Sequence, residues 1–388
     1  METAAARDLL TWFGARSRDV PWRGDPDPYR VWVCEVMAQQ TRIGTVRERI
    51  PSFFESYPTL ESLAAADPDE LMRAWEGLGY YARARNLRRA AARLVERAGA
   101  AGEAAALPSH ASELRELPGI GPYTAGAVAS IAFGRAEPAV DGNARRVLSR
   151  LFDLERPTPA VLDERARRLI HAADAADAAD DGHGSRPAGE NGKERARERP
   201  SLAGALNQAI MDLGGEVCTP RSPSCPACPL SKHCVALASG TVAERPPRRS
   251  RQRIPHHDIG VALVWRDDGR LYIQRRPDEG LLGGLWEFPG GKVECGESPA
   301  EAAERETLEE TGLRVGMGGS AGRVEHAYSH FRITLHAFHA RVTGGRLRTD
   351  REEPHVWVEP DELDAYAFPA ANRRILEGLE GLPPKPTR

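Results

Sequence analysis

Three groups of side chains in this 388-residue sequence have types and spacings that suit chemistry. The first is acidic: the stretch AERETLEETG, residues 303–312, contains four glutamates. If the stretch is helical, Glu306, Glu309 and Glu310 share one face, at positions i, i+3 and i+4. Like charges placed in this way repel each other, so the face is either simply solvated or it holds a cation.

The second group is a quartet of cysteines with the spacing C-x6-C-x2-C-x5-C: Cys218, Cys225, Cys228 and Cys234. In a reducing compartment such a quartet is more often bound to a metal than paired in disulfides. A zinc ribbon normally pairs two distant CxxC hooks, which this spacing does not provide. Four thiolates in one compact loop favour a 4Fe-4S cluster, with zinc as the alternative.

The third group is a pair of isolated carboxylates in the first half of the chain. Glu35 lies inside the apolar run 31–37. A glutamate there usually faces solvent or pairs with a cation, whereas a buried one would have the raised pKa that suits a general acid. Asp141 begins the stretch DGNARR, where an aspartate ordinarily caps the following helix. The turn at 118–121 exposes backbone N–H groups that can bind a phosphate, although Gly-x-Gly alone is equally an ordinary turn between helices.

The elements that must position these groups change character along the chain. Residues 1–170 predict short helices, because apolar residues recur at helical spacing and prolines interrupt the pattern. Strand patterns follow later, at 259–265, 271–276 and 331–342. One long helical pattern, 299–311, interrupts the strands. The prediction is therefore an all-α domain followed by an α+β domain.

Composition sets the expected boundaries of these domains. Residues 174–200 contain almost no large apolar side chains, so we expect a disordered insertion there. Residues 236–255 are rich in Arg and Pro and are expected to be a linker. The predicted domains are thus 1–235, which includes the cysteine loop 218–234, and 256–380.

The bulk properties of the chain narrow the classes of partner. No run approaches the roughly 20 apolar residues of a membrane span, and the N-terminus has no signal-peptide layout. We therefore expect a cytoplasmic monomer that does not bind membranes. The net charge is −3, yet the arginine-rich stretches 73–97 and 245–253 are suited to contacting phosphates, unless they are simply solvated surface.

Taken together, the motifs of the first half resemble a known family. A helix-hairpin-helix, then an aspartate and then the cysteine spacing are similar to the endonuclease III superfamily of base-excision DNA glycosylases. The segments PWR, VWVCEVMAQQT, WEGLGYYARARNL, LPGIGPYTAGA, VDGN and LNQAIMDLG resemble the MutY family of adenine DNA glycosylases within it. The resemblance covers nearly all of residues 8–235 outside the insertion. It implies a hydrolase of N-glycosyl bonds that acts in base excision repair, with a 4Fe-4S cluster. The implied partner is double-stranded DNA with adenine opposite 8-oxoguanine or guanine.

The resemblance also implies roles for individual residues. Asp141 matches the catalytic aspartate, Glu35 matches the glutamate that protonates adenine, and Asn143 would orient Asp141 or a water. Tyr123 stands where bifunctional relatives carry a lysine that forms a Schiff base, so a monofunctional glycosylase is implied. The remaining matches are Trp22, Arg23 and Gln208 in the adenine pocket, Gln40 and Tyr80 in the base stack, and Gly119 and Gly121 in the DNA-binding hairpin. Core packing is the alternative for Trp22 and Tyr80, and Leu206 departs from relatives that often carry an aromatic residue.

The second half resembles the C-terminal domain of the same family, which is related to the 8-oxo-dGTP hydrolase MutT. The segment HAYSHF, 326–331, is similar to the loop that reads the base opposite adenine. The resemblance implies that Ser329 would bond the oxidised base, while Tyr328 and His330 would fix the loop.

A Nudix box, G-x5-E-x7-REUxEExGU, is present apart from Thr307 at an aliphatic position. Its residues here are Gly291, Glu297, Arg305, Glu306, Glu309 and Glu310. The resemblance implies a Mg²⁺ site on the three helical glutamates, with Glu352 or Glu353 as a further ligand. Asn372, in FPAAN, would read an oxidised purine.

Two hypotheses follow for the Nudix-like domain. It is either a binding module for the base opposite adenine, or also a pyrophosphohydrolase of 8-oxo-dGTP. For the first half the rivals are a thymine-mismatch or oxidised-pyrimidine glycosylase, which Tyr123 and the second domain disfavour, and an electron-transfer protein. No flavin or partner motif supports electron transfer, so we expect a structural cluster that places Arg221 and Lys232 near phosphates.

Overall fold

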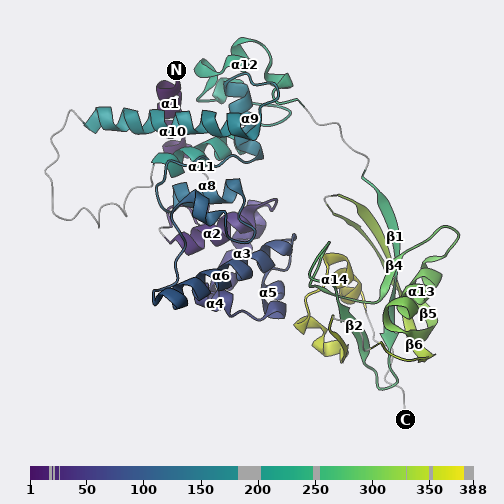
Figure 1. The fold of residues 1–388 in the computed structure, drawn as a ribbon. Helices are drawn as coiled ribbons and strands as arrows, with labels where there is room; N and C mark the ends of the chain where they lie inside the picture. Colours follow the sequence, from purple (N-terminus) through teal and green to yellow (C-terminus); the bar gives the residue numbers. More distant parts are fainter. Residues whose placement is uncertain are drawn as a thin grey trace. The chain divides into compact units, whose positions relative to one another are not determined.

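The computed structural model describes residues 1–16, 20, 22–25, 27–181, 202–247, 254–328, 330–348 and 353–379. By their contacts the residues form two compact units, each described by itself below (Figure 1). The first unit comprises Met1–Ala65 and Asn86–Ser250, and the second comprises Ala66–Arg85 and Arg251–Arg388. No helix in the described ranges is both long and apolar enough to cross a membrane.

The first unit is helical, as the sequence predicted. Its α-helices are α1 (Glu2–Arg16), α2 (Pro28–Ala38), α3 (Ile43–Ser56), α4 (Leu60–Ala64), most of α6 (Ala82–Ala101), α7 (Ala111–Leu114), α8 (Pro122–Ile131), α9 (Gly142–Leu151), α10 (Pro159–Asp181), α11 (Leu202–Glu216) and α12 (Val235–Ala238). Leu9 of α1, Leu148 of α9 and Ile170 of α10 lie in one buried core with α11. Burying the apolar faces of several short helices against each other stabilises elements that would be marginal alone.

Helix α10 differs from the expectation at its C-terminal end. It continues to Asp181, into the segment 174–200 for which we expected disorder. The repeated alanines of ADAADAAD favour helix, which the absence of large apolar side chains does not prevent. Residues 182–200 lie outside the described residues.

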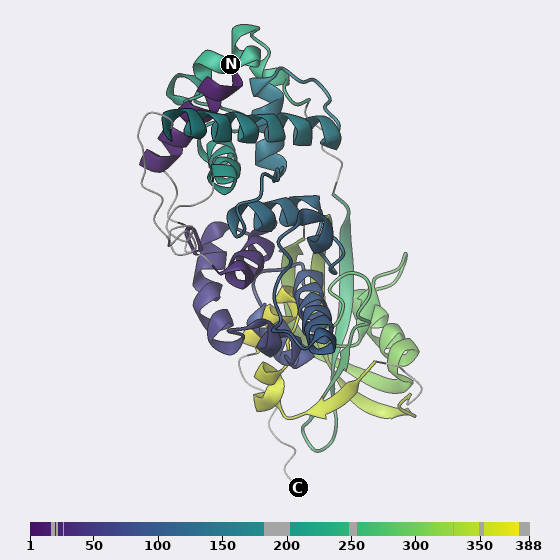
Figure 2. The same ribbon diagram turned by 60° about the vertical axis from the view of Figure 1, so that its left-hand side comes forward.

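The cysteine segment lies beside the N-terminal helix α1 (Figure 2). It contains two short 3-10 helices, η2 (Cys225–Ala227) and η3 (Ser231–His233), before α12. His233 Nε2 lies 2.9 Å from Asp8 Oδ2 of α1, and Leu230 belongs to the same core as that helix. The segment is therefore anchored on helical packing as well as on its own turns.

The second unit contains a seven-stranded mixed sheet in its described part, with the order β3-β2-β1-β6-β5, β4 paired to β1 and β7 paired to β2. The strands are β1 (His256–Trp265), β2 (Leu271–Arg275), β3 (Trp286–Glu287), β4 (Gly290–Lys292), β5 (Leu313–Ala327), β6 (Arg332–Gly345) and β7 (His355–Val358). Strands β1 and β6 run parallel over ten residue pairs. The helices are α5 (Pro68–Ala74), α13 (Pro299–Thr311), α14 (Ala370–Glu377) and the 3-10 helix η5 (Pro360–Ala365).

Helices α13 and α14 lie on opposite sides of this sheet (Figure 1). Successive residues of a strand point to opposite faces. Val261 and Leu263 of β1 accordingly pack in one core with Ile375 of α14, and Ala262 packs in the other with Ala303 of α13. The predicted α+β domain is confirmed. Its helix α13 packs on the face of the sheet opposite to α14.

The sequence also fixes both ends of α13. Ser298 and Glu301 form a reciprocal capping box at its start, and Gly312 ends it with a φ of 75°. A positive φ of this size favours glycine, as does the close approach of Arg346 O, 2.5 Å from where a Cβ would lie. Thr307, the departure in the Nudix box, is fully buried and donates to Ala303 O at 2.6 Å. The pattern 299–311 predicted from sequence is therefore confirmed by α13.

Candidate functional site

Glu35 lies on the buried helix α2. Asp27 caps this helix and Pro28 begins it, and the residues from Val31 to Met37 are buried. Glu35 is only 6% exposed. The usual outcome for a glutamate in an apolar run, exposure to solvent, does not occur here.

Two donors hold the Glu35 carboxyl group. Trp22 Nε1 donates to Oε1 at 3.1 Å, and the Tyr123 hydroxyl donates to Oε2 at 2.8 Å. Burial raises the pKa of Glu35, the two hydrogen bonds oppose that rise, and the charge of Asp141 adds to it. A carboxyl group in this environment stays protonated to a higher pH than an exposed glutamate.

Asp141 caps helix α9, which is the ordinary role for this position, and it also lines a cavity. Its Oδ1 accepts from Ala144 N at 2.6 Å, and its Oδ2 accepts from Asn143 Nδ2 at 3.1 Å. Burial raises the pKa of Asp141, while these hydrogen bonds lower it. Capping therefore fixes the orientation of the carboxylate without removing it from the cavity.

Arg146 holds Asn143 in turn, and the sequence analysis missed it. Its Nη2 donates to Asn143 Oδ1 at 2.8 Å and to Gly214 O at 2.6 Å, and its Nε donates to Cys218 O at 2.7 Å. A hydrogen-bonded chain thus runs from Asp141 to the backbone of the first cysteine. The spacing of Asn143 and Arg146 at i and i+3 was a signal for the first contact, but nothing in the sequence indicated the contact with Cys218.

A cavity of about 560 Å³ brings several of the predicted residues together. Its lining includes Gln40, Gly119, Gly121, Tyr123 and Asp141. Glu35 is not in the lining but is bonded to Tyr123, which is. The cavity is therefore bordered by the hairpin and by Gln40. It is also bordered by Tyr123, which contacts Glu35, and by Asp141, which contacts Asn143.

The hairpin glycine Gly119 is required by its geometry. Its φ is 76°, and a Cβ there would lie 2.6 Å from Asn86 Cβ. Gly121 is the N-cap of α8, and no side chain caps this helix start. Uncapped backbone N–H groups at a helix N-terminus suit a phosphate.

A second network holds the residues predicted for the adenine pocket. Arg23 Nε donates to Gln208 Oε1 at 2.9 Å, and Arg23 Nη2 lies 3.0 Å from Asp212 Oδ2. Asp212 is 1% exposed and was missed, although it lies in the motif LNQAIMDLG. Trp22 is 6% exposed, so it both packs in the core and contacts Glu35.

Tyr80 belongs to the second unit and is 36% exposed. Its φ is 47°, which is uncommon for a bulky residue, and the Arg83 guanidinium lies 5.6 Å from the centre of its ring. Plain core packing, the alternative for this residue, does not describe an aromatic ring with that exposure.

The four clustered cysteines are unpaired and line one small cavity together with Arg150. Arg150 is 3% exposed; its Nη1 donates to Cys218 Sγ at 3.3 Å, and its carbonyl accepts from Cys234 Sγ at 3.4 Å. Burial raises the pKa of Cys228 to about 11, and the neighbouring thiols add to the rise. These cysteines are half-buried, and as thiolates this close together they would need positive charge, so their chemistry fits a bound metal cluster, although the described side chains do not converge in a metal-binding arrangement.

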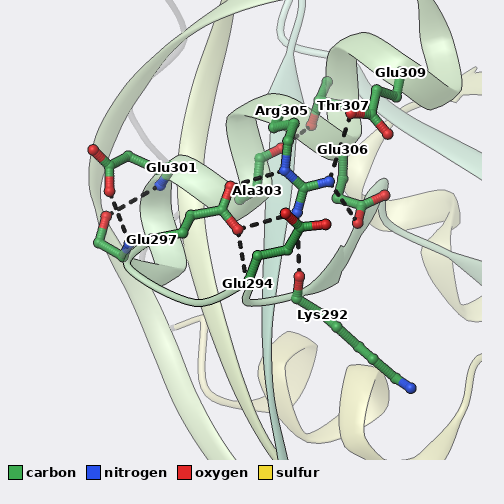
Figure 3. Close-up of polar contacts among 10 residues, drawn as sticks. Lys292, Glu294, Glu297, Glu301, Ala303, Arg305, Glu306, Thr307 and Glu309 are labelled. Atoms are coloured by element: carbon green, nitrogen blue, oxygen red, sulfur yellow. Dashed lines mark hydrogen bonds and ion pairs between the residues drawn. The ribbon is translucent and has the colours of Figure 1, made fainter.

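Three glutamates of the Nudix box, Glu297, Glu306 and Glu309, lie around the Arg305 side chain (Figure 3). Arg305 Nε donates to Glu297 Oε1 at 2.8 Å, and its Nη1 donates to Glu306 Oε1 at 3.0 Å and lies 3.6 Å from Glu309 Oε1. The hydrogen bond from Arg305 lowers the pKa of Glu297. Arg305 thus links the loop that carries Glu297 to helix α13.

Glu310 is held separately from the other two carboxylates. Its Oε2 accepts from Gln274 Nε2 at 2.8 Å and from Gly290 N at 3.1 Å. Gly291 leaves room for Glu306, because a Cβ there would lie 2.2 Å from Glu306 Oε1. Among the described residues, no three His, Cys, Asp or Glu side chains converge in a metal-binding arrangement. The carboxylates of Glu306, Glu309 and Glu310 supply the oxygen ligands that Mg²⁺ prefers, and their spacing places them on one face of helix α13.

A second cavity lies in the second unit and brings Glu310, Asn372, Tyr328 and His330 together. The Tyr328 and Phe331 rings stack with centres 4.7 Å apart. Ser329 and Glu352 lie outside the described residues, and Glu353 is not among the cavity residues.

Comparison with known proteins agrees with both halves of this description. The model of the HhH-GPD superfamily of base excision DNA repair proteins matches residues 33–172, and the NUDIX domain model matches residues 260–378. Fold and site therefore define a base-excision DNA glycosylase that carries a NUDIX domain.

Relatives narrow this class further. The adenine DNA glycosylase of Homo sapiens is 31% identical, over 98% of this chain and 75% of that protein. That of Rattus norvegicus is 30% identical, over 97% of this chain and 78% of that protein. A solved thermostable thymine-DNA glycosylase is 25% identical with a TM-score of 0.49, over 61% of this chain and 97% of that one. The chain belongs to the adenine DNA glycosylase family.

Proposed function

We propose that this protein is a monofunctional glycosylase that removes adenine from DNA where adenine lies opposite 8-oxoguanine or guanine. The observation that carries the proposal is the buried carboxyl group of Glu35, bonded to Tyr123 beside the cavity that Asp141 lines. Membership of the adenine DNA glycosylase family supports the choice of base.

Two carboxyl groups of different character suit this reaction. Cleavage of the bond between C1′ and N9 leaves an anionic purine and a cationic sugar. Glu35, with its raised pKa, donates a proton to N7 of adenine. Asp141, oriented by Ala144 and Asn143, stabilises the positive charge at C1′.

Tyr123 supports the assignment as monofunctional. Its hydroxyl donates to Glu35, and a tyrosine cannot form the imine that a lyase requires. We expect a product with an intact strand and an abasic site, which breaks only after treatment with alkali. Strand cleavage without alkali at the rate of adenine release would contradict this assignment.

The target adenine must leave the duplex stack before it can react. We assign Trp22, Arg23 and Gln208 to the pocket that receives adenine, with Arg23 held between Gln208 and Asp212. Gln40 and Tyr80 would fill the vacated stack, and the backbone around Gly119 and Gly121 would bind a phosphate.

We assign a 4Fe-4S cluster to Cys218, Cys225, Cys228 and Cys234. When bound, it supplies a rigid, charged crosslink of the loop, which carries Arg221 and Lys232 for contact with phosphates. Iron and acid-labile sulfide analysis of the purified protein tests this assignment. Zinc without sulfide would contradict it.

Reading of the opposite base is assigned to Tyr328, Ser329 and His330. The stack of Tyr328 on Phe331 supports a defined position for the Tyr328 ring. The partner preference that follows is faster adenine release opposite 8-oxoguanine than opposite guanine. Action on chromosomal DNA would place the protein at the nucleoid in the cytoplasm.

A second candidate function is hydrolysis of 8-oxo-dGTP by the NUDIX domain. The Nudix box with all of its charged residues, the link from Arg305 to Glu297, and the cavity that contains Glu310 and Asn372 favour it. Mg²⁺ on Glu306, Glu309 and Glu310, when bound, would hold the pyrophosphate and activate water. Release of pyrophosphate from 8-oxo-dGTP, compared with Glu309→Gln, tests this function, and equal release by the two would contradict it.

The primary function is tested with a panel of duplexes. We expect single-turnover base release from adenine opposite 8-oxoguanine and from adenine opposite guanine, and none from thymine opposite guanine. Release of thymine instead of adenine would identify the rival mismatch glycosylase.

A further inference from the structure

Residues 66–85 belong by their contacts to the second unit, although the strands of that unit begin only at His256. The segment contains helix α5, the turn of Tyr80 and the first turn of α6. It packs on the sheet domain, by which we mean the second unit from residue 254 onward. Since we assign Tyr80 to the vacated base stack of the DNA, the contacts that hold this segment bear on the glycosylase reaction.

The first of these contacts joins Asp69 of α5 to two strands. Trp286 Nε1 of β3 donates to Asp69 Oδ1 at 3.0 Å, and Arg275 Nε of β2 lies 3.9 Å from the same oxygen. Trp286 is 5% exposed and belongs to the core of the sheet domain, so its ring is fixed. A hydrogen bond from a buried donor to a carboxylate stabilises more than an exposed ion pair does. Asp69 therefore anchors the beginning of the segment.

The second contact joins Glu76, directly before the turn of Tyr80, to Arg373 of α14. Arg373 Nε donates to Glu76 Oε1 at 3.1 Å, and the two side chains are only 16% and 27% exposed. The same guanidinium donates from Nη2 to Tyr366 O at 2.8 Å and from Nη1 to Asp364 Oδ1 at 2.8 Å. Because three acceptors fix the plane of the guanidinium, Arg373 presents Nε to Glu76 in a defined orientation.

The turn after Glu76 transmits this contact to Tyr80. Gly79 and Tyr80 have φ values of 69° and 47°, and a bulky residue keeps such a conformation only where its surroundings hold it. Trp75 Nε1 donates to Gly79 O at 3.0 Å, and Arg83 Nη2 donates to the same oxygen at 2.9 Å. These bonds tie the turn to its two ends, so a displacement of Glu76 would displace Tyr80.

Helix α14 borders the cavity of the sheet domain as well as Glu76. Ile375, 2% exposed, anchors the helix in the core. Asn372 lines the cavity that contains Tyr328, whereas the next residue, Arg373, contacts Glu76. One helix thus borders the loop assigned to reading the opposite base and also holds the segment of Tyr80.

We propose that the ion pair of Glu76 and Arg373 positions the turn of Tyr80, so that the sheet domain helps to unstack the target adenine besides reading the base opposite it. Glu76 and Arg373 are positioning residues, because the group that would enter the DNA stack is Tyr80. The inference rests on the proposed role of Tyr80. It goes beyond that role, since the assignments above give the sheet domain recognition of the opposite base and no part in unstacking.

The first experiment measures unstacking by fluorescence with the full-length protein. The duplex carries adenine opposite 8-oxoguanine, and 2-aminopurine beside that adenine fluoresces more strongly when its stacking is lost. The amplitude of the rise is read before adenine is released. We expect Glu76→Ala and Arg373→Ala to lower this amplitude and to slow single-turnover adenine release about three- to tenfold at saturating protein. The affinity for an undamaged duplex should stay near that of wild type, whereas a general loss of folding would lower it as well.

Three further variants make the comparison specific. Glu70→Ala is the matched control, because Glu70 is an exposed glutamate of the same segment that lies 3.8 Å from Arg73 of its own helix, and it should behave as wild type does. Arg373→Lys keeps the positive charge and should retain more amplitude and rate than Arg373→Ala. The variant with both Glu76→Ala and Arg373→Ala should lose no more than the more affected single variant, because the two changes remove one contact. Circular dichroism guards against misfolding, and if Arg373→Ala loses the native spectrum, Glu76→Ala carries the test.

The second experiment repeats both measurements in a Tyr80→Ala background. If the pair acts through Tyr80, adding Glu76→Ala should cause no further loss of amplitude or rate. Fully additive losses would overturn the positioning role, as would amplitudes in Glu76→Ala and Arg373→Ala that equal the wild-type amplitude.

Failure of the proposed function would look different from failure of this inference. A Tyr80→Ala protein that equals wild type in both measurements would overturn the role of Tyr80 and the inference together. Wild-type protein that unstacks the duplex without releasing adenine would contradict the glycosylase function alone, and the fluorescence amplitudes would still decide whether Glu76 and Arg373 position Tyr80.

Discussion

At the scale of single residues, the environment of Glu35 decides its chemistry. The apolar run 31–37 allowed either a solvated or a buried glutamate, and only the positions of Trp22 and Tyr123 distinguish the two. These residues are 13 and 88 positions away in the chain, so no local pattern reports them. The sequence could therefore nominate the residue but could not establish its burial or its raised pKa.

The raised pKa of Glu35 predicts the pH dependence of adenine release. The protonated form is the active acid, and burial extends that form to higher pH than an exposed glutamate allows. The single-turnover rate should therefore stay high above the ordinary glutamate pKa of about 4.3 and fall as pH rises through the raised value. A rate that rises steadily from about pH 5 to about pH 9 would contradict the assignment of Glu35 as the acid. This interval covers roughly the range of pKa values that buried carboxyl groups can reach.

The same shift has a consequence for stability, with a definite sign. Because the folded-state pKa of Glu35 lies above the unfolded value, ionisation disfavours the folded state as pH rises between the two values. Glu35→Gln cannot ionise at this position, so its free energy of unfolding should increase relative to that of wild type as pH rises from acid to neutral. Urea unfolding at several pH values measures this difference. A difference that does not change with pH would argue against a raised pKa of Glu35.

Arg146 gives a third prediction at this scale. Arg146→Ala breaks the link from Asn143 to Gly214 and Cys218, and it should slow adenine release by about 10- to 100-fold because Asp141 loses its fixed position. The neighbouring Arg145→Ala is the matched control. The iron content and the affinity for DNA of both variants are measured alongside, and an unchanged single-turnover rate in Arg146→Ala would remove its positioning role.

At the scale of elements, the helical pattern 299–311 made α13 the best-predicted part of the molecule. The capping box of Ser298 and Glu301 and the C-cap Gly312 are local features that set its two ends. Helix α10 shows the opposite case, because low apolar content predicts disorder from residue 174 whereas alanine supports helix to Asp181. Arg150 and Asp212 were missed because they act on partners distant in the chain.

The cap of α13 can be tested by Ser298→Ala. Removing the side chain that accepts from Glu301 N should lower the melting midpoint of the second unit by about 2–8 °C. Ser298 N donates to Glu301 Oε2 at 2.8 Å, and bonding to Ser298 lowers the pKa of Glu301, so the contribution of this carboxylate is present above the ordinary glutamate pKa and is lost as pH falls through the lowered value. Glu304→Gln, exposed on the same helix, is the control, and equal midpoints for both variants at neutral pH would contradict the cap.

At the scale of the whole molecule, the proposed roles fall in different units. One unit carries the carboxyl groups to which we assign bond cleavage, and the other carries the loop and cavity to which we assign recognition of a damaged base. The motifs predicted two domains, although residues 66–85 group with the second unit instead of the first. They could not indicate that the reading loop and Asn372 share one cavity, because the residues come from different strands and helices of the sheet domain.

Tyr328→Ala tests the division directly. Loss of the ring that stacks on Phe331 should reduce the ratio of adenine release opposite 8-oxoguanine to that opposite guanine, while the rate opposite guanine changes little. The raised pKa of Tyr328, about 12, means that the hydroxyl stays neutral throughout the assay. Tyr366→Phe is the control, and equal losses on both duplexes would indicate a general structural defect rather than a reading role.

The central claim is that Glu35 acts as the acid of an adenine glycosylase. Its most direct test is single-turnover release of adenine from a duplex that pairs adenine with 8-oxoguanine, followed as alkali-labile strand breaks, for wild type and Glu35→Gln. The account predicts release by wild type and a loss of about 100-fold or more in the variant, whose amide cannot donate the proton as an acid does. Undiminished release by Glu35→Gln, or none by the folded, cluster-containing wild type, would contradict it.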